Sequence, residues 1–302
     1  MKKIIIGAFA LAFVITSTAA RANENVSITG FFQQIIGMGD DTTGGITHEF
    51  DRINFNASTT TDNGWEVGGV LQHEPTFDRT AGPTTLHMFV NTELGNIAIG
   101  HTMDAVTFTV SRINGMVPGG GIDAGYQFLF FDGTQGNRGV KGSEAYYAMN
   151  GARVLYTPPS INGVNIKISY TPSHDNNTMS ARGRTANGAG LNTHQETLEV
   201  AASYSGEIEG IGYTVALGSK NGNGIDNFGT TGNDLQVIVG TIKLTQGAWA
   251  LGYAAYDNGD SFGSSDDSTT ASSSGWNTAL THSMGNIVIG VGYSEWEAVS
   301  GT

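Results

Sequence analysis

Large apolar residues alternate with small or polar ones in many short stretches of the chain. In NIVIGVGYS (286–294), every second residue from Ile287 is Ile, Val or Tyr. Alternation with period two places these residues on one face of a β-strand. The pattern recurs in about thirteen stretches, and none shows sustained helical periodicity. The sequence therefore predicts an all-β protein.

The two faces of the predicted strands differ in polarity. The apolar face includes Phe55, Leu71, Met88, Ile166, Val200 and Tyr204, and the polar face includes Arg52, Asn54, Glu66, His87, Asn165, Lys167 and Glu199. Six glycines also fall on the polar face: Gly68, Gly100, Gly218, Gly252, Gly290 and Gly292. Because such glycines would leave costly cavities in a packed core, we expect this face to border a water-filled space.

The connections between predicted strands alternate between short turns and long polar loops. The short turns lie at 62–64, 94–96, 160–163, 208–211, 246–247 and 283–286, and the long loops at 39–45, 75–83, 104–143, 173–194, 221–233 and 257–274. Asn and Gly in the short turns suit tight β-hairpins. Short turns at one end and long loops at the other are typical of an up-and-down antiparallel sheet.

Two architectures fit this pattern, a soluble β-sandwich and a membrane β-barrel with its apolar face toward lipid. The aromatic residues favour the barrel, because they cluster near the strand ends as in interfacial girdles. Trp65, Tyr156, Tyr213 and Trp249 lie beside short turns, and we expect Tyr170, Tyr204, Trp276 and Tyr293 nearer the long loops. The sequence therefore predicts an antiparallel up-and-down transmembrane β-barrel.

The N-terminus has the pattern of a secretory signal peptide. Lys2 and Lys3 precede an apolar run at 4–15, and Ala20, Arg21 and Ala22 form an A-x-A cleavage site. We expect a signal peptide at 1–22, cleaved after Ala22, and a barrel at 23–302. An N-terminal anchor fits less well, because the run is shorter than the roughly 20 residues that a spanning helix needs. Export of a strand-built membrane protein points to the outer membrane of a Gram-negative cell.

Charge and composition exclude several classes of partner. Removal of Lys2, Lys3 and Arg21 from the 14 basic residues leaves 11 against 27 acidic ones, a formal charge of −16. Such a chain is a poor ligand for nucleic acid. Without cysteine, it has neither disulfides nor thiolate metal sites. No HExxH or GxSxG motif occurs, so we predict no catalytic residues, no metal site and no cofactor.

Three stretches carry a resemblance to a known family: TTTDNGWEVGGVL, ELGNIAIGHTMDA and YTPPSINGVNIKISY. With the alternation of turns and loops, the chain resembles the general porins, the trimeric channels of Gram-negative outer membranes. The resemblance implies a homotrimer of sixteen-stranded barrels. It also implies that the third long loop, 104–143, folds into the pore and narrows it. Porins usually end on Phe, whereas this chain ends at Thr302 after about thirteen strands, so we expect the sequence to lack C-terminal strands.

The resemblance also suggests which residues line the pore. Acidic residues of the third loop would face basic residues of the wall across a constriction, and the field between them would orient solutes and select ions. The acidic candidates are Asp104, Asp123, Asp132 and Glu144, and the basic ones are Arg52, Arg153 and Lys167.

The predicted function is passive diffusion of ions and small hydrophilic solutes, with a preference for cations that the excess of acidic residues indicates. A substrate-specific channel stays open as an alternative, because Phe128, Phe130 and Phe131 supply aromatic residues in the third loop. A surface adhesin or exported β-rich binding protein is a second alternative. An outer-membrane enzyme is a third, although no residues at fixed spacing support it.

Overall fold

The protein is described by a computed structural model. It describes residues 24–31, 34–39, 42–48, 52–73, 83–110, 113, 116–117, 151–173, 194–224, 226–227, 230–231, 233–259, 261 and 272–299. The predicted signal peptide lies outside these residues. No helix in the described part of the chain is long and apolar enough to cross a membrane.

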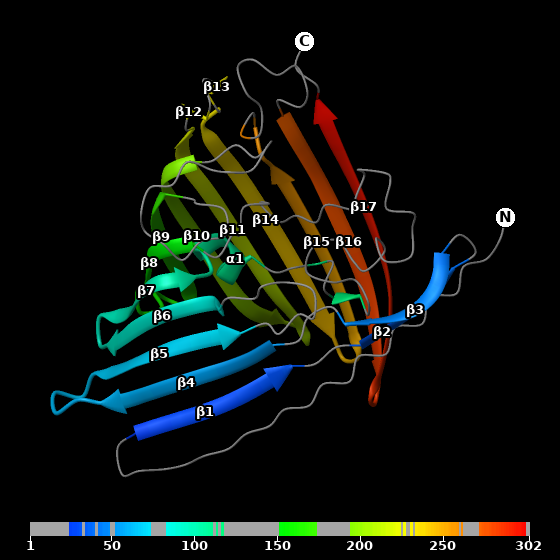
Figure 1. Ribbon diagram of the computed structural model, residues 1–302. Helices are drawn as coiled ribbons and strands as arrows, with labels where there is room; N and C mark the ends of the chain where they lie inside the picture. Colours follow the sequence, from blue (N-terminus) through cyan, green and yellow to red (C-terminus); the bar gives the residue numbers. More distant parts are fainter. Residues whose placement is uncertain are drawn as a thin grey trace.

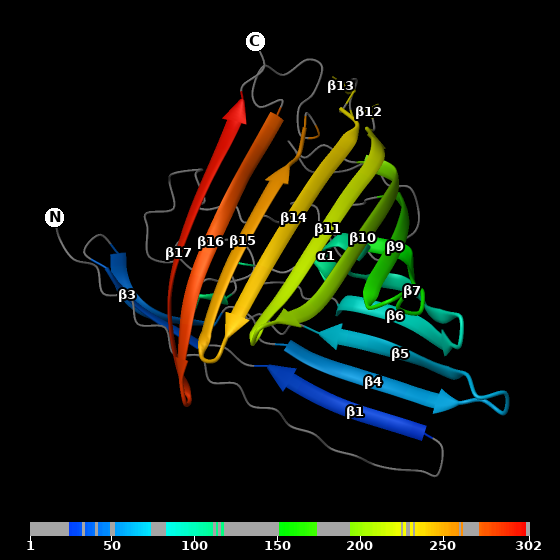
Figure 2. The same cartoon turned by 180° about the vertical axis from the view of Figure 1, so that it is seen from behind.

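Thirteen strands form one curved antiparallel sheet, which confirms the predicted fold class (Figure 1). In sheet order the strands are β1 (Glu24–Phe31), β4 (Arg52–Thr60), β5 (Glu66–His73), β6 (Pro83–Thr92), β7 (Gly95–Thr102), β8 (Gly151–Thr157), β9 (Val164–Ser173), β10 (His194–Ile208), β11 (Ile211–Gly224), β14 (Leu235–Gln246), β15 (Trp249–Asp257), β16 (Ser272–Met284) and β17 (Ile287–Val299). Each strand pairs with the next main-sheet strand along the chain, so the topology is up-and-down. Among the described strands, β1 and β17 are the two edges (Figures 1 and 2).

All six predicted short turns connect neighbouring strands of this sheet. Each of them contains a residue with positive φ, and two contain a pair of such residues, Asn162 and Gly163 (51° and 83°) and Glu209 and Gly210 (51° and 79°). Two successive residues of this kind match the right-handed twist of the flanking strands.

Three short elements lie outside the predicted pattern. The segment 39–45, predicted as an open loop, is part of a hairpin of β2 (Gln34–Gly39) and β3 (Thr42–His48). The predicted loop 221–233 contains the end of β11 and the pair β12 (Asp226–Asn227) and β13 (Thr230–Thr231). A helix, α1 (Ala105–Thr109), follows β7. The helix α1 and the two-residue strands β12 and β13 are too short for hydrophobic periodicity to be read, and the sequences of β2 and β3, QIIGMG and TTGGITH, do not alternate between large apolar and polar residues.

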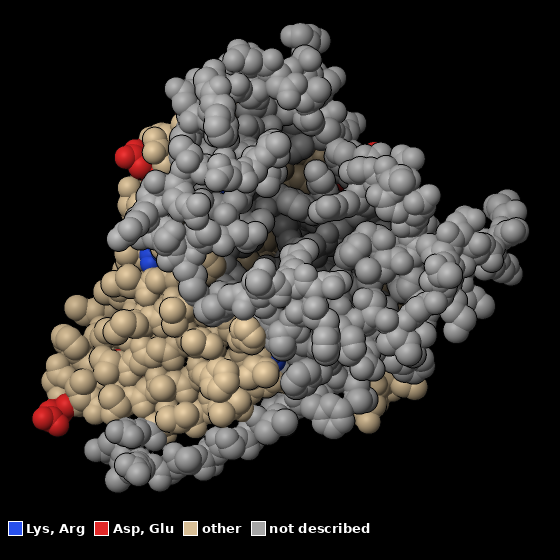
Figure 3. All heavy atoms as spheres, in the orientation of Figure 1, with Lys and Arg blue, Asp and Glu red and all other residues tan. Residues whose placement is uncertain are grey.

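The strand register confirms which residues share a face. Exposed Ile97, Ile99 and Val154 lie on the outer face of β7 and β8, whereas Ala98 and Leu155, in register between them, are buried on the inner face. The described surface over β4–β6 is almost free of charged atoms, and the acidic atoms seen on this part of the molecule lie at its tip (Figure 3). An apolar outer face with polar groups inside is the arrangement of a membrane barrel.

Aromatic pairs lie near both ends of the sheet. Near the short turns, Trp249 contacts His282 with 4.2 Å between ring centroids. Toward the long loops, Trp276 contacts Tyr253 and Tyr293 at 5.9 and 5.4 Å. The position predicted for Tyr204 is wrong. It pairs with Val164, the first residue of β9, and therefore lies near the short turns, because β10 is longer than its apolar pattern indicated.

Leu217→Arg tests the assignment of the two faces. Leu217 is 63% exposed on the outer face of β11, so the arginine would be placed in lipid. We expect a loss of about 2–4 kcal/mol in the free energy of folding into phospholipid bilayers, measured by urea titration. The control is Asn165→Arg, at an exposed position on the inner face of β9, for which we expect a change within about 0.5 kcal/mol. Equal losses in both variants would contradict the assignment.

Candidate functional site

The third long loop begins with a helix cap. Asp104 follows β7 and precedes α1, and its carboxylate accepts a hydrogen bond from the Thr107 amide at 2.7 Å. The Thr107 hydroxyl donates to the same carboxylate at 2.9 Å. Aspartate is a favoured N-cap residue because it satisfies amides that have no partner within the helix. The cap therefore fixes the direction in which the loop leaves the wall.

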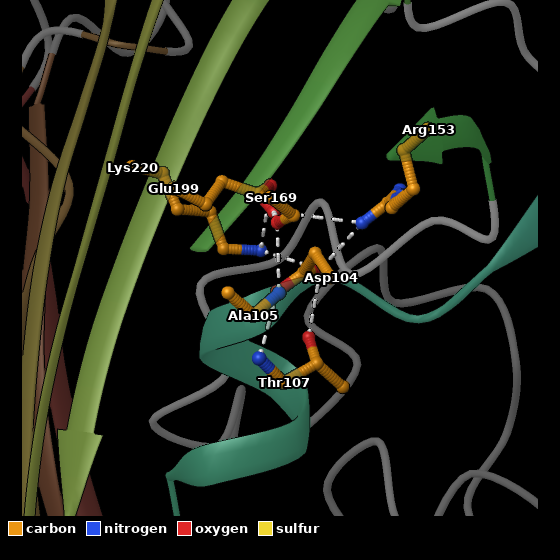
Figure 4. A network of polar contacts seen from close by, with 7 residues as sticks. All are labelled: Asp104, Ala105, Thr107, Arg153, Ser169, Glu199 and Lys220. Atoms are coloured by element: carbon orange, nitrogen blue, oxygen red, sulfur yellow. Dashed lines mark hydrogen bonds and ion pairs between the residues drawn. The ribbon is translucent and has the colours of Figure 1, made fainter. Parts of the chain in front are cut away.

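Asp104 is also the centre of a buried network of charges (Figure 4). The Lys220 ammonium of β11 donates to its Oδ2 at 2.9 Å, and Arg153 Nη1 of β8 lies 3.5 Å from the same oxygen. Glu199 of β10 completes the network, with Oε2 3.5 Å from Arg153 Nη1 and Oε1 3.8 Å from Lys220 Nζ. All four side chains are at most 1% exposed. Two acidic and two basic groups balance one another, so the network carries no net charge.

A serine connects this network to the backbone of the helix. Ser169 of β9 donates its hydroxyl hydrogen to Glu199, and it accepts a hydrogen bond from the Ala105 amide at 2.9 Å (Figure 4). The first residue of α1 is thus held by the wall through a side chain as well as through Asp104. The start of the loop is attached to four neighbouring strands, β8 to β11.

The charge balance sets the ionisation of Asp104, which lies in the loop outside the strands. Burial raises the pKa of Asp104, but Lys220 and Arg153, together with the Thr107 hydrogen bond, outweigh burial and hold the pKa at about 2. The carboxylate is therefore ionised at neutral pH, and both of its basic partners are retained.

Beyond Asp104, apolar residues of the loop pack on the inner face of the sheet. Val106 and Val110 form a buried cluster with Ala201, Ala216, Val239 and Tyr256, and Ile113 packs with Ala254 and Ala279. The small residues of the sheet on which these loop residues pack are called the small-residue surface. They are Ala201, Ala216, Gly218, Gly252, Ala254, Ala279 and Gly292. This surface spans β10 to β17.

The glycines of this surface correct a prediction. A Cβ at Gly218 would lie 2.8 Å from Val106 Cγ1, and one at Gly252 would lie 2.6 Å from Ile113 Cδ1. One at Gly292 would lie 3.2 Å from Val117 Cγ2. These three glycines therefore do not border water as we expected. They make room for the third loop, because interiors pack without space for an added methyl group.

The structure brings together two of the predicted site residues, Asp104 and Arg153, and leaves two others apart from them. Lys167 lies on the inner face of β9, with its ammonium 5.5 Å from the centroid of the Phe108 ring. Arg52 pairs with Phe31 of β1 and Asn54 pairs with Thr29. Because the two residues are two positions apart in β4, they lie on the same, inner face of the strand. Asp123, Asp132 and Glu144 lie outside the described residues.

The sequence did not single out Glu199 and Lys220 as site residues. Both lie the same number of residues from the turn at Glu209 and Gly210, so the hairpin pairs them directly. That spacing is a signal that sequence reasoning could have used. Within the described ranges, no group of three His, Asp or Glu residues could hold a metal ion.

Lys220→Met tests the network. The substitution leaves Asp104 and Glu199 with one basic partner, Arg153, in a buried place. We expect a loss of about 3–5 kcal/mol in unfolding free energy, measured by denaturant titration. The control is Lys243→Met, which removes a lysine on the inner face of β14 outside the network. A loss no larger than in this control would contradict the role of Lys220.

The pKa of Asp104 gives a pH prediction. Its lowered pKa contributes stability that is fully present above its ordinary value of 3.8 and is lost as the pH falls through about 2. We therefore expect the stability difference between wild type and Asp104→Asn to be constant from pH 7 to about 5 and to be lost progressively as the pH falls to about 1, below both pKa values. Asparagine keeps the helix cap, so the comparison isolates the charge. A difference that persists unchanged below pH 2 would refute the ionised state of Asp104.

Comparisons with known proteins agree with this architecture. A family model described as Gram-negative porin matches residues 7–302. The anion-selective porin from Comamonas acidovorans is similar in structure, with a TM-score of 0.60, 11% identity, and coverage of 91% of this chain and 79% of that one. A mutant porin of Rh. blastica has a TM-score of 0.55, 16% identity, and coverage of 90% and 84%. None of the curated proteins matches the chain in sequence. The chain belongs to the Gram-negative porins, a family of outer-membrane channels.

Proposed function

We propose that this porin is a passive diffusion channel for ions and small hydrophilic solutes, and that its third loop, 104–143, narrows the pore. The observation that carries the proposal is the position of the start of the loop. Val106, Val110 and Ile113 are buried against inner-face residues, and Asp104 is attached to the same wall. A loop held on the inner face reduces the cross-section of the pore, and the remaining cross-section limits the size of the solutes that can pass.

A preference for cations is part of the proposal. Acidic residues outnumber basic ones by 27 to 14 in the whole chain. The network around Asp104 pairs two acidic residues with two basic residues, so the excess of acidic residues in the rest of the chain is the same. We propose that Asp123, Asp132 and Glu144 contribute acidic groups to the constriction, opposite Arg52 and Lys167, as the resemblance implies. Asp104 and Arg153, also predicted to line the pore, are instead buried in the network and do not face the open lumen. Opposed charges across a narrow pore select among ions by electrostatics.

Assembly and export follow from the same resemblance. We propose a homotrimer, in which part of the apolar outer face of each barrel is buried against its neighbours instead of lipid. We also propose that residues 1–22 are removed after Ala22 during export. The remaining outer face contacts outer-membrane lipid.

The test is the conductance of the purified protein in planar lipid bilayers under a salt gradient. We expect stepwise ohmic openings and a reversal potential on the cation side, because the excess acidic charge attracts cations into the pore. Ionic conductance that reaches a plateau as the salt concentration rises would favour the substrate-specific alternative.

Folding of the same preparation is monitored by its β-sheet circular dichroism. Folded protein that gives no openings would refute the channel and favour the adhesin. Openings with an anion-side reversal potential would refute only the cation preference.

A further inference from the structure

A pocket opens on the inner face of the sheet beside α1. Its volume is about 260 Å³, and it lies between β6, β7, β8 and β9. Two phenyl rings, Phe89 and Phe108, form apolar walls, and His87, Asn91, Asn96 and Lys167 contribute polar groups to the lining. The pocket is separate from the network around Asp104, none of whose charged residues lines it.

Two polar side chains of this pocket lack the partners that such groups normally have. The Lys167 ammonium lies 5.5 Å from the Phe108 ring centroid, but no carboxylate within the described ranges lies at ion-pair distance from it. His87 Nδ1 is buried, and no described group forms a hydrogen bond with it. Partly buried cations and buried ring nitrogens are usually paired. An anionic group in the pocket would supply the missing partner.

An acidic residue beside this wall is already engaged. Glu66 of β5 accepts a hydrogen bond from the Asn91 amide at 2.7 Å and does not line the pocket. Lys167 therefore gives the pocket a positive charge that no lining residue balances. Asn96 donates a hydrogen bond to the side-chain oxygen of Asn91, and the remaining amide hydrogens of both residues can donate to a ligand.

From these features we infer that the pocket binds small aromatic carboxylates, with the carboxylate at Lys167 and the ring between Phe89 and Phe108. Since a water molecule takes about 30 Å³ in the liquid, the pocket has room for roughly nine waters. That space suits a molecule of one ring and one carboxylate. The inference rests on the proposed channel function, because it names a class of solute that the pocket would bind while the solute passes through the pore.

The experiment uses benzoate on open channels of the full chain in planar bilayers. We expect benzoate to reduce the ionic current in a saturable way. Benzamide, which has the same shape without the charge, serves as the matched solute. It should bind at least about tenfold more weakly, because a hydrogen bond to a charged group is worth more than one between neutral groups.

Three variants locate the effect. Lys167→Met keeps the length of the side chain, and we expect the benzoate affinity to fall by about tenfold or more. Lys243→Met removes another lysine of the inner face, far along the sheet on β14, and we expect an unchanged affinity. Phe108→Leu removes a ring wall and leaves the charge, and we expect a loss of about two- to tenfold. If Lys167→Met does not insert into the bilayer, Phe108→Leu and the comparison with benzamide still test whether benzoate binds in this pocket.

Open channels that benzoate leaves unaffected would overturn the inference while leaving the channel itself intact. Equal binding of benzamide and benzoate would overturn it as well. So would equal losses in Lys167→Met and Lys243→Met, which would mean that benzoate responds only to the overall charge of the lumen. A preparation without any openings would instead refute the proposed function.

Discussion

A strand that faces lipid has to hydrogen-bond its backbone to neighbouring strands, because hydrocarbon offers no other partner. This constraint explains the continuous antiparallel ladder from β1 to β17. It also explains why apolar side chains such as Ile99 and Leu217 point outward and are exposed. With the outer face given to lipid, the inner face receives the polar, charged and small residues. The interior of the sheet therefore cannot be filled by the large apolar side chains of an ordinary core.

The third loop fills part of that interior by two different means. Its apolar residues pack on the small-residue surface, where Gly218 and Gly252 provide the space. Its first residue, Asp104, is held by Lys220 and Arg153. Apolar packing is non-directional. A buried charge network requires defined positions of its side chains, because a buried charge without its partner lowers the stability of the fold. We infer that the network sets where the loop begins and that the small-residue surface holds the apolar residues after Asp104.

Local regularity made most of the fold predictable from the sequence. Period-two patterns identified the faces, and Asn, Gly and their neighbours identified all six short turns. The pairing of Glu199 with Lys220 was also within reach, since a tight hairpin fixes the register from its turn. The contacts of Asp104 with Arg153 and Lys220 were not, because no local rule relates residues on opposite sides of a long loop. The role of Gly218 was missed for the same reason. A glycine has no side chain that indicates whether water or Val106 faces it.

The inner wall has two unlike halves, and this difference bears on where solutes pass. On β14 to β16, the inner-face residues Val239, Ala254 and Ala279 are buried in clusters with apolar residues of the third loop. On β4 and β5, Asn54, Asn56 and Glu66 are only partly buried, and the pocket at Lys167 lies on the neighbouring strands. Amide and carboxylate groups that keep contact with water can exchange hydrogen bonds with a hydrated solute, whereas a covered apolar wall cannot. A solute crossing the pore would therefore follow the amide-lined strands, and it would meet the charge of Lys167 on the way.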